Sequence, residues 1–273
     1  MAIVGLQTLE NQTKELVRNQ QLREEETYLN WLTPIDHGSK HRDVLLQRQA
    51  GTGQWIIESE RFRKWRCATE SKTLLCPGMP GAGKTFIAAT IIEHLHQQFQ
   101  DDSNIAVIFI YFDFNRQDEQ TADNLIASLV KQLSHLRPGS LSRLYRDHQR
   151  RRTRPSREEM LKTLYTIATS YTKLFLVVDA VDECQNNGTR KLFLQVIFDL
   201  QAQTNTNILA TFRHDTEIQQ KLHNSTVLEI HARNQDIERY IDGSMHKLPD
   251  FVENNRELSS KVKRQIIARV DGM

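Results

Sequence analysis

Short apolar runs alternate with longer segments of helical periodicity through most of the chain. Five runs have the length and character of buried strands: residues 73–76, 105–112, 174–178, 207–212 and 226–230. Apolar positions recur at helical spacing in the segments between and after them: 84–99, 123–135, 158–171, 190–202, 234–247 and 257–270. This alternation is typical of a parallel sheet flanked by helices. It predicts an α/β fold with a doubly wound parallel sheet of about five strands.

The chain ahead of the first strand has a different pattern. Residues 1–30 carry leucines among Gln, Glu, Arg and Lys, which predicts one polar helix. Its broken apolar stripe favours a connector that docks on something else over a weak coiled coil. Pro34 and Gly38 are expected to end it, so residues 31–54 are predicted to be an irregular linker. A short helical run over 56–65 follows, with three expected inward residues: Ile57, Phe62 and Trp65.

Composition and charge exclude several classes of protein. The 273 residues are 38% hydrophobic and 26% charged, enough apolar surface for a folded core. The net charge of +2 argues against a dedicated binder of nucleic acid or anionic membranes. The longest apolar run, eight residues over 105–112, falls far short of the roughly 18 that span a bilayer. With no secretory signal at the N-terminus, we expect a cytoplasmic protein.

Cysteines and histidines give no metal-ligand pattern in the sequence. Cys67, Cys76 and Cys184 lack C-x-x-C spacing, which favours free thiols over zinc ligands or disulfides. His94 and His96 are two positions apart on a predicted helix, so they point to different faces and are poor joint ligands.

A phosphate-binding motif follows the first predicted strand and opens the next helix. The segment matches G-x-x-x-x-G-K-[ST], and its expected nucleotide-binding residues are Gly78, Met79, Pro80, Gly81, Ala82, Gly83, Lys84 and Thr85. Glycines let backbone amides point at phosphates, and the helix N-terminus adds partial positive charge. Lys84 is expected to reach the β- and γ-phosphates, and Thr85 to bind Mg²⁺. The alternative is a glycine-rich turn that binds no ligand.

Carboxylates follow the third predicted strand. Asp179 ends that strand and is the expected second Mg²⁺ ligand. Asp182 and Glu183 lie just beyond, where they would orient and polarise an attacking water, which favours hydrolysis over phosphoryl transfer. The alternative is that these acids cap a solvated loop.

Arg213 follows the fourth predicted strand. In P-loop ATPases with an acid of this type, that strand is inserted between the strand before the loop and the strand that ends in the metal-binding acid. Arg213 would then face the terminal phosphate, which guanidinium binds in a bidentate geometry. The alternative is a surface arginine paired with Asp215 or Glu217.

Together these residues resemble a NACHT-type nucleotide-binding domain, as found in fungal NOD-like (STAND) proteins and in the nephrocystin-like N-terminal family. The resemblance covers about residues 28–273 and rests on these segments: 48–55, Phe62, Trp65, 75–85, 111–112, 179–184 and 211–213. It implies a signalling switch that is closed with a nucleoside diphosphate and open and self-associating with a triphosphate, in which slow Mg²⁺-dependent hydrolysis is a reset.

The resemblance also implies an organisation of the chain and a role for Trp55. We expect an N-terminal helix (1–30), a linker and pre-loop segment (31–68), a NACHT-like core (69–232) and a helical tail (233–273) that looks truncated. Trp55 is expected either to border the adenine or to pack in the core, and Trp65 to pack in the core.

Residues 137–157 hold eight arginines and one acid, Asp147. A solvated face is the preferred interpretation, ahead of a self-association surface or a nucleic-acid site. Three functions remain open: a switch that binds ATP or GTP and hydrolyses it weakly, a turnover ATPase or kinase, and a non-catalytic interaction remnant. The expected partners are nucleotide and NACHT-type proteins or a second copy, with no membrane and no nucleic acid.

Overall fold

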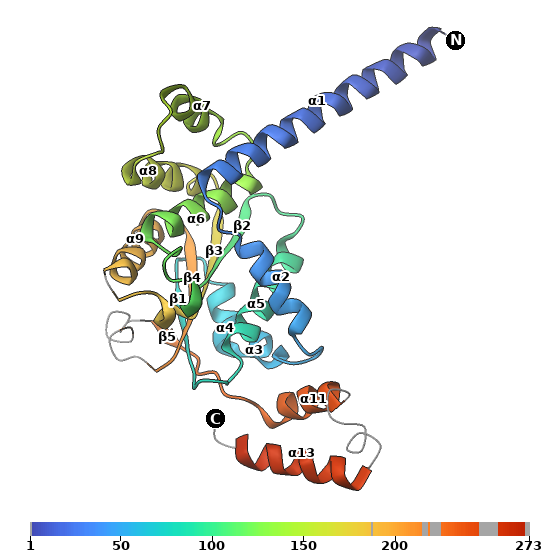
Figure 1. Ribbon diagram of the computed structural model, residues 1–273, viewed down its shortest axis with the longest axis vertical. Helices are drawn as coiled ribbons and strands as arrows, with labels where there is room; N and C mark the ends of the chain where they lie inside the picture. The colour runs from blue at the N-terminus through green and yellow to red at the C-terminus, as the bar shows by residue number, and fades with distance from the viewer. Residues whose placement is uncertain (1, 187, 215–217, 219–224, 246–255, 271–273) are drawn as a thin grey trace.

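The computed structural model describes residues 2–186, 188–214, 218, 225–245 and 256–270 (Figure 1). Its strands are β1 (Thr73–Pro77), β2 (Ile105–Tyr111), β3 (Lys173–Asp179), β4 (Thr206–Phe212) and β5 (Thr226–Val227). Helices before β2 are α1 (Ala2–Leu32), α2 (His37–Gln47), α3 (Gln54–Glu58), α4 (Glu60–Arg66) and α5 (Lys84–Phe99). Later helices are α6 (Ala122–Leu136), α7 (Ser142–Arg151), α8 (Arg157–Ala168), α9 (Thr189–Gln203), α11 (Asn234–Ser244) and α13 (Arg256–Val270). Two 3-10 turns are η1 (Phe114–Arg116) and η2 (Val181–Glu183).

The strands form one parallel sheet in the order β2-β3-β4-β1-β5. As the sequence predicts, β4 lies between β1, which leads into the phosphate-loop motif, and β3, which ends at Asp179. Parallel strands bring their carboxyl ends to one edge of the sheet, so residues 78–85, Asp179 and Arg213 lie at that edge. The predicted α/β fold with a five-stranded, doubly wound sheet is confirmed.

Alternation along the strands divides the core into two layers. Even-numbered β2 residues from 106 to 110 join a cluster with α6, α8 and α9, and odd-numbered residues from 107 to 111 join a second cluster with α5. Helices α2, α3 and α4 complete the second layer (Figure 1). Period-two alternation sends successive side chains to opposite faces, so a continuous apolar strand fills both layers.

The first helix docks by its C-terminal end only, so the expectation for its apolar stripe holds at Leu29, whereas Leu16 and Leu22 are exposed. Leu29 and Leu32 of α1 are buried in the first layer, where α1 contacts α6 and α7, while the other end of α1 extends away from the core (Figure 1). Among the described residues, no helix combines the length and apolar character that crossing a bilayer requires.

The expectation of an irregular linker over residues 31–54 is wrong, because this segment contains α2. Asp36 caps the helix by accepting a hydrogen bond from the Ser39 amide at 3.0 Å, and Gly38 lies in the first turn instead of ending a helix. The inward positions have helical spacing: His37, His41 and Val44. Two of the three are histidines, so the apolar periodicity that would have revealed the helix is missing.

The helical run over 56–65 is two helices. Ser59 adopts an extended conformation (φ −63°, ψ 138°), which ends α3, and its hydroxyl accepts a hydrogen bond from the Phe62 amide, which starts α4. Phe62 and Trp65 are buried as expected. The inward isoleucine of α3 is Ile56, and Ile57 is only partly buried. The fifth strand is shorter than predicted, with a further bridge between Gly78 and Ile230.

Candidate nucleotide-binding site

The phosphate-loop motif forms a tight turn between β1 and α5. Gly81 (φ 82°) and Gly83 (φ 87°) adopt left-handed conformations, which glycine tolerates best. A Cβ atom added to Gly83 would meet no atom within 4 Å, so this side of the turn faces open space. Gly83 is the N-cap of α5 and offers no side-chain cap, which leaves amide N–H groups of the first turn for a bound anion.

Gly78 has a different reason to be glycine. A Cβ atom there would lie 2.6 Å from the carbonyl oxygen of Ile230, because the chain after β5 bridges to this position. The Ile230 amide also donates to the carbonyl of Pro77 at 2.7 Å. The first glycine of the motif is therefore required by close backbone packing at the edge of the sheet.

Lys84 reaches back across the loop. Its Nζ donates to the carbonyl oxygens of Gly78 at 2.9 Å and Met79 at 3.0 Å. Burial lowers the pKa of Lys84, and the nearby charge of Asp182 opposes this shift. The ammonium group is therefore held at the loop beside an acidic neighbour, where it can pair with an anion.

Asp179 lies at the tip of β3 and is 2% exposed. Its Oδ1 accepts a hydrogen bond from Thr211 Oγ1 at 2.6 Å, and its carboxylate also accepts one from the Thr85 side chain. Burial raises the pKa of Asp179 to about 6, against the lowering effect of both threonines and of Lys84. The structure thus brings Thr85 and Asp179 together, and their oxygens are donors that suit Mg²⁺.

Thr211 is a site residue that sequence reasoning missed. It is fully buried near the end of β4, and its hydroxyl also accepts a hydrogen bond from the amide of Ala180 at 3.0 Å. Ala180 has a positive φ of 56°, unusual for a residue other than glycine. The available signal was a polar residue inside the apolar run that ends β4, residues 208–212. Thr211 fixes the turn that leads from Asp179 to the next two acids.

Arg213 pairs with both acids of that turn. Its Nε lies 3.3 Å from Asp182 Oδ2 and its Nη2 lies 3.3 Å from Glu183 Oε1, while its amide donates to Asp182 Oδ1 at 3.0 Å. Glu183 Oε2 also accepts from the Phe114 amide at 3.1 Å. The three predicted residues Asp182, Glu183 and Arg213 therefore form one charged cluster. The alternative partners of Arg213, residues 215 and 217, lie outside the described residues.

A cavity of about 500 Å³ adjoins the loop. Its lining includes residues of the motif (Gly81, Ala82 and Gly83) and of the segment before β1, together with residues from α11. Its wall is largely apolar, and the side chains that line it include Gln49, Trp55, Phe86, Arg233, Ile237 and Tyr240. Volume and character are those of a small-molecule site.

Trp55 lines this cavity and also packs against the edge of the second core layer. It is half-buried, and the guanidinium of Arg233 stacks over its ring, 4.2 Å from the ring centroid. Asp236 Oδ2 accepts a hydrogen bond from the Gly53 amide at 3.0 Å, which joins α11 to the turn before α3. The contribution of α11 was missed because its residues are more than 170 positions from this turn and have no local motif.

A family model described as Nephrocystin 3, N-terminal matches residues 51–213, which is more than half of the chain. The chain belongs to the nephrocystin 3 N-terminal family. The match runs from the turn before α3 to Arg213, so it contains the phosphate loop, Asp179 and the charged cluster, whereas α11 lies beyond it. Among curated proteins, none matches the chain closely enough to count as a relative.

Solved structures resemble this nephrocystin-type chain in fold. The Orc1 protein of Aeropyrum pernix, solved in complex with DNA, superposes with a TM-score of 0.51 at 14% identity. The match covers 72% of this chain and 50% of the Orc1 chain. Domain III of the Thermotoga maritima replication initiation protein DnaA has a TM-score of 0.41 at 13% identity, covering 76% and 77%. This chain thus spans about half the length of Orc1, and the likeness shows a P-loop NTPase fold.

Proposed function

We propose that this chain is a nucleotide-dependent switch module of the NACHT type, which binds ATP or GTP with Mg²⁺ and hydrolyses it slowly. The observation that carries the proposal is the continuity of the phosphate loop with the adjoining cavity: Gly81 to Gly83 belong to both. A ligand with a planar base and a phosphate chain would fill the cavity beside Trp55 and meet Lys84 at the loop.

The residues at the loop suit a nucleotide with its metal. Thr85 and Asp179 would hold Mg²⁺, since their oxygens already meet through a hydrogen bond. The metal would neutralise charge on the phosphate oxygens. Lys84 would exchange its contacts with two loop carbonyls for contacts with phosphate, a stronger, charge-assisted interaction.

The charged cluster supplies the switching element of the proposal. Arg213 is held by Asp182 and Glu183, so the guanidinium and both carboxylates neutralise one another. A γ-phosphate within reach would compete with the two acids for Arg213. Release of the acids would leave carboxylates that orient a water molecule. A ligand that shifts such a pairing must favour one arrangement over the other, so ATP and ADP would stabilise different states.

The remaining parts of the proposal concern partners. NACHT-type protein partners or a second copy of the chain are the proposed readers of the switch, and the cytoplasm its location. The expectation that nucleic acid is not a partner stays a prediction. The Orc1 structure, which was solved in complex with DNA, does not support it.

Thermal and chemical unfolding with Mg²⁺ and ADP, ATP or GTP tests the proposal. A ligand present at a hundredfold excess over Kd stabilises the folded state by about 2.7 kcal/mol. We expect this stabilisation in the wild type, its loss in Lys84→Ala, and its retention in the control Lys191→Ala, which removes an exposed lysine on α9.

The outcomes separate the three functions. Stabilisation that depends on Lys84, with slow release of phosphate, supports the switch. Fast multiple turnover by the isolated chain would instead indicate an ATPase or kinase. A folded chain that no nucleotide stabilises would overturn the proposal and leave a non-catalytic interaction module.

A further inference from the structure

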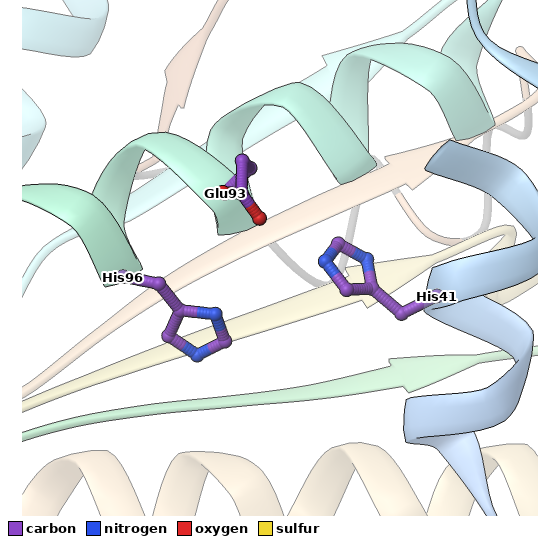
Figure 2. Close-up of side chains that lie close together, drawn as sticks. All are labelled: His41, Glu93 and His96. Carbon is purple, nitrogen blue, oxygen red and sulfur yellow. The ribbon is translucent and has the colours of Figure 1, made fainter. Parts of the chain in front are cut away.

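Three metal-ligating side chains converge where α2 packs on α5. His41 comes from α2, and Glu93 and His96 come from one face of α5 (Figure 2). One ligand atom from each residue lies within 4.8 Å of the other two. Among the described residues no other group of three or more His, Cys, Asp or Glu side chains meets this condition.

His41 has an unpartnered nitrogen. The residue is 7% exposed, and its Nε2 is buried without any hydrogen-bond partner. Its Nδ1 lies 2.8 Å from the Tyr111 hydroxyl. A buried polar atom without a partner is costly, and most such atoms in folded proteins are satisfied. When Nδ1–H donates to Tyr111, the lone pair of Nε2 is left for a ligand, an arrangement typical of metal-binding histidines.

The other two groups also have free donor atoms. Glu93 Oε1 accepts a hydrogen bond from Gln97 at 2.7 Å, which orients the carboxylate and leaves its second oxygen. His96 is exposed, and one of its ring nitrogens donates a hydrogen bond to the backbone of Val107, which leaves the lone pair of the other nitrogen for a metal. The neutral imidazole is the form that binds metals.

We propose that His41, Glu93 and His96 form a binding site for a divalent transition metal of the zinc class, with a water molecule as the fourth ligand. Zinc–nitrogen and zinc–oxygen bonds of about 2.0–2.1 Å put tetrahedral ligand atoms roughly 3.3 Å apart, so the side chains must close by at most about 1.5 Å. Rotation of the exposed His96 and of Glu93 can provide this. Two imidazoles favour zinc over Mg²⁺ or Ca²⁺, which prefer oxygen ligands.

The site is separate from the phosphate loop. Glu93 follows Lys84 by nine residues, about 14 Å along the axis of α5. A bound ion would join α2 to α5. These helices are otherwise held together by packing and by a hydrogen bond of 3.2 Å from the side chain of Arg48, the residue after α2, to Thr90 of α5. Because α2 leads directly to Gln49 at the cavity, the metal would hold that wall of the cavity in place.

Titration of the purified full chain with Co²⁺, followed by displacement with Zn²⁺, tests the site. Tetrahedral Co²⁺ with nitrogen and oxygen ligands gives visible absorption bands, and a thiolate ligand would add a strong near-ultraviolet band. We expect one Co²⁺ per chain without the thiolate band. His96→Gln and Glu93→Gln each remove a ligand. Loss of a mere outer-shell partner weakens metal affinity roughly 10–100-fold, so we expect at least that loss of Co²⁺ affinity in each variant.

The variants are chosen so that folding does not obscure the result. His96 is exposed and Glu93 only partly buried, so both variants should fold, which circular dichroism verifies. The control His135→Gln removes an exposed histidine at the end of α6 and should bind Co²⁺ like the wild type. Equal affinity in wild type, His96→Gln and Glu93→Gln, a thiolate band, or no binding at all would overturn the proposal.

Discussion

At the scale of single residues, Trp65 joins three parts of the domain. Its ring is 2% exposed and packs against Phe62 and Phe175, and its Nε1 donates to the carbonyl of Ile208 at 2.9 Å. The same N–H also approaches the carbonyl of Lys72 at 3.1 Å. The side chain thus contributes both apolar burial and a partner for buried carbonyls beside β4.

Replacing Trp65 should separate these two contributions. Trp65→Phe keeps most of the packing but leaves the carbonyls without their donor, so we expect a loss of about 1–3 kcal/mol in the free energy of unfolding. Trp65→Ala adds a cavity and should cost roughly 3–5 kcal/mol. Urea denaturation followed by fluorescence of the remaining tryptophans measures both. Equal midpoints for the two variants would contradict this assignment.

Arg213 gives a second prediction at this scale. The side chain is about half exposed, so loss of its ion pairs in Arg213→Gln should change stability by less than about 1 kcal/mol. Under the proposed function, the same variant should bind ADP normally but lose any preference between ATP and ADP. Calorimetric titration with both nucleotides measures this ratio, with Arg143→Gln on α7 as the control. An unchanged ratio in Arg213→Gln would argue against a sensing role.

At the scale of elements, α2 depends on its N-cap. The Asp36 carboxylate accepts hydrogen bonds from the amide and the hydroxyl of Ser39, which also lower the pKa of Asp36. Asp36→Ala should cost about 0.5–2 kcal/mol of stability, whereas Asp36→Asn, which keeps a capping oxygen, should cost less. Urea denaturation of the two variants distinguishes capping from a general effect of charge, which both substitutions remove equally.

Helix α2 also predicts a pH dependence of stability. His37 is buried, its Nδ1 accepts a hydrogen bond from the Tyr111 amide at 3.3 Å, and burial lowers its pKa from 6.5 to about 4. Asp36 opposes this shift, and Arg116 and Lys131 add to it. The unfolded chain binds the proton first, so stability is full above about pH 6.5 and falls as pH drops toward 4.

One such histidine can change the free energy of unfolding by at most about 1.4 kcal/mol per pH unit. His37→Asn keeps an acceptor for the Tyr111 amide but cannot titrate. The free energy of unfolding of this variant should therefore fall less steeply between these pH values than that of the wild type. Denaturation series at several pH values provide the comparison, and parallel curves would show that His37 does not titrate on unfolding.

At the scale of the whole molecule, several arginines of the arginine-rich segment, residues 137–157, make contacts within the protein. Arg137 stacks over Tyr171, Arg154 stacks over Trp31, and Arg157 pairs with Asp123 at 2.5 Å. The other arginines of the segment lie on or next to α7: Arg143, Arg146, Arg150, Arg151 and Arg152. Part of the positive charge therefore positions α1, α6 and α8, and a smaller cationic face remains.

This distribution predicts weak binding to nucleic acid. With a net charge of +2, the chain should bind duplex DNA no more tightly than the roughly 10⁻⁴–10⁻⁶ M of non-specific binding at physiological salt, and less tightly as salt increases. Fluorescence anisotropy over a salt series measures this. Tight binding near 0.15 M salt that is lost in the double variant Arg150→Gln and Arg151→Gln would identify α7 as a nucleic-acid surface.

The sequence by itself determined the sheet and the local motif. Each strand is a contiguous apolar run, and the segment from Gly78 to Thr85 is continuous, so both are readable without knowledge of distant contacts. Local periodicity decides the strands and the motif because backbone geometry repeats over a few residues. The place of β4 between β1 and β3 was expected from the similarity to P-loop ATPases and not from any local pattern.

The tertiary structure decided which distant side chains meet. The pairing of Arg213 with Asp182 and Glu183, the stacking of Arg233 on Trp55 and the approach of His41 to His96 all join segments that are far apart in the chain. The sequence compares His96 only with His94, which points to a different face of the helix. Its actual partner His41 lies on α2, which the sequence did not predict to be helical. These contacts depend on how helices pack on the sheet, and no local pattern encodes that.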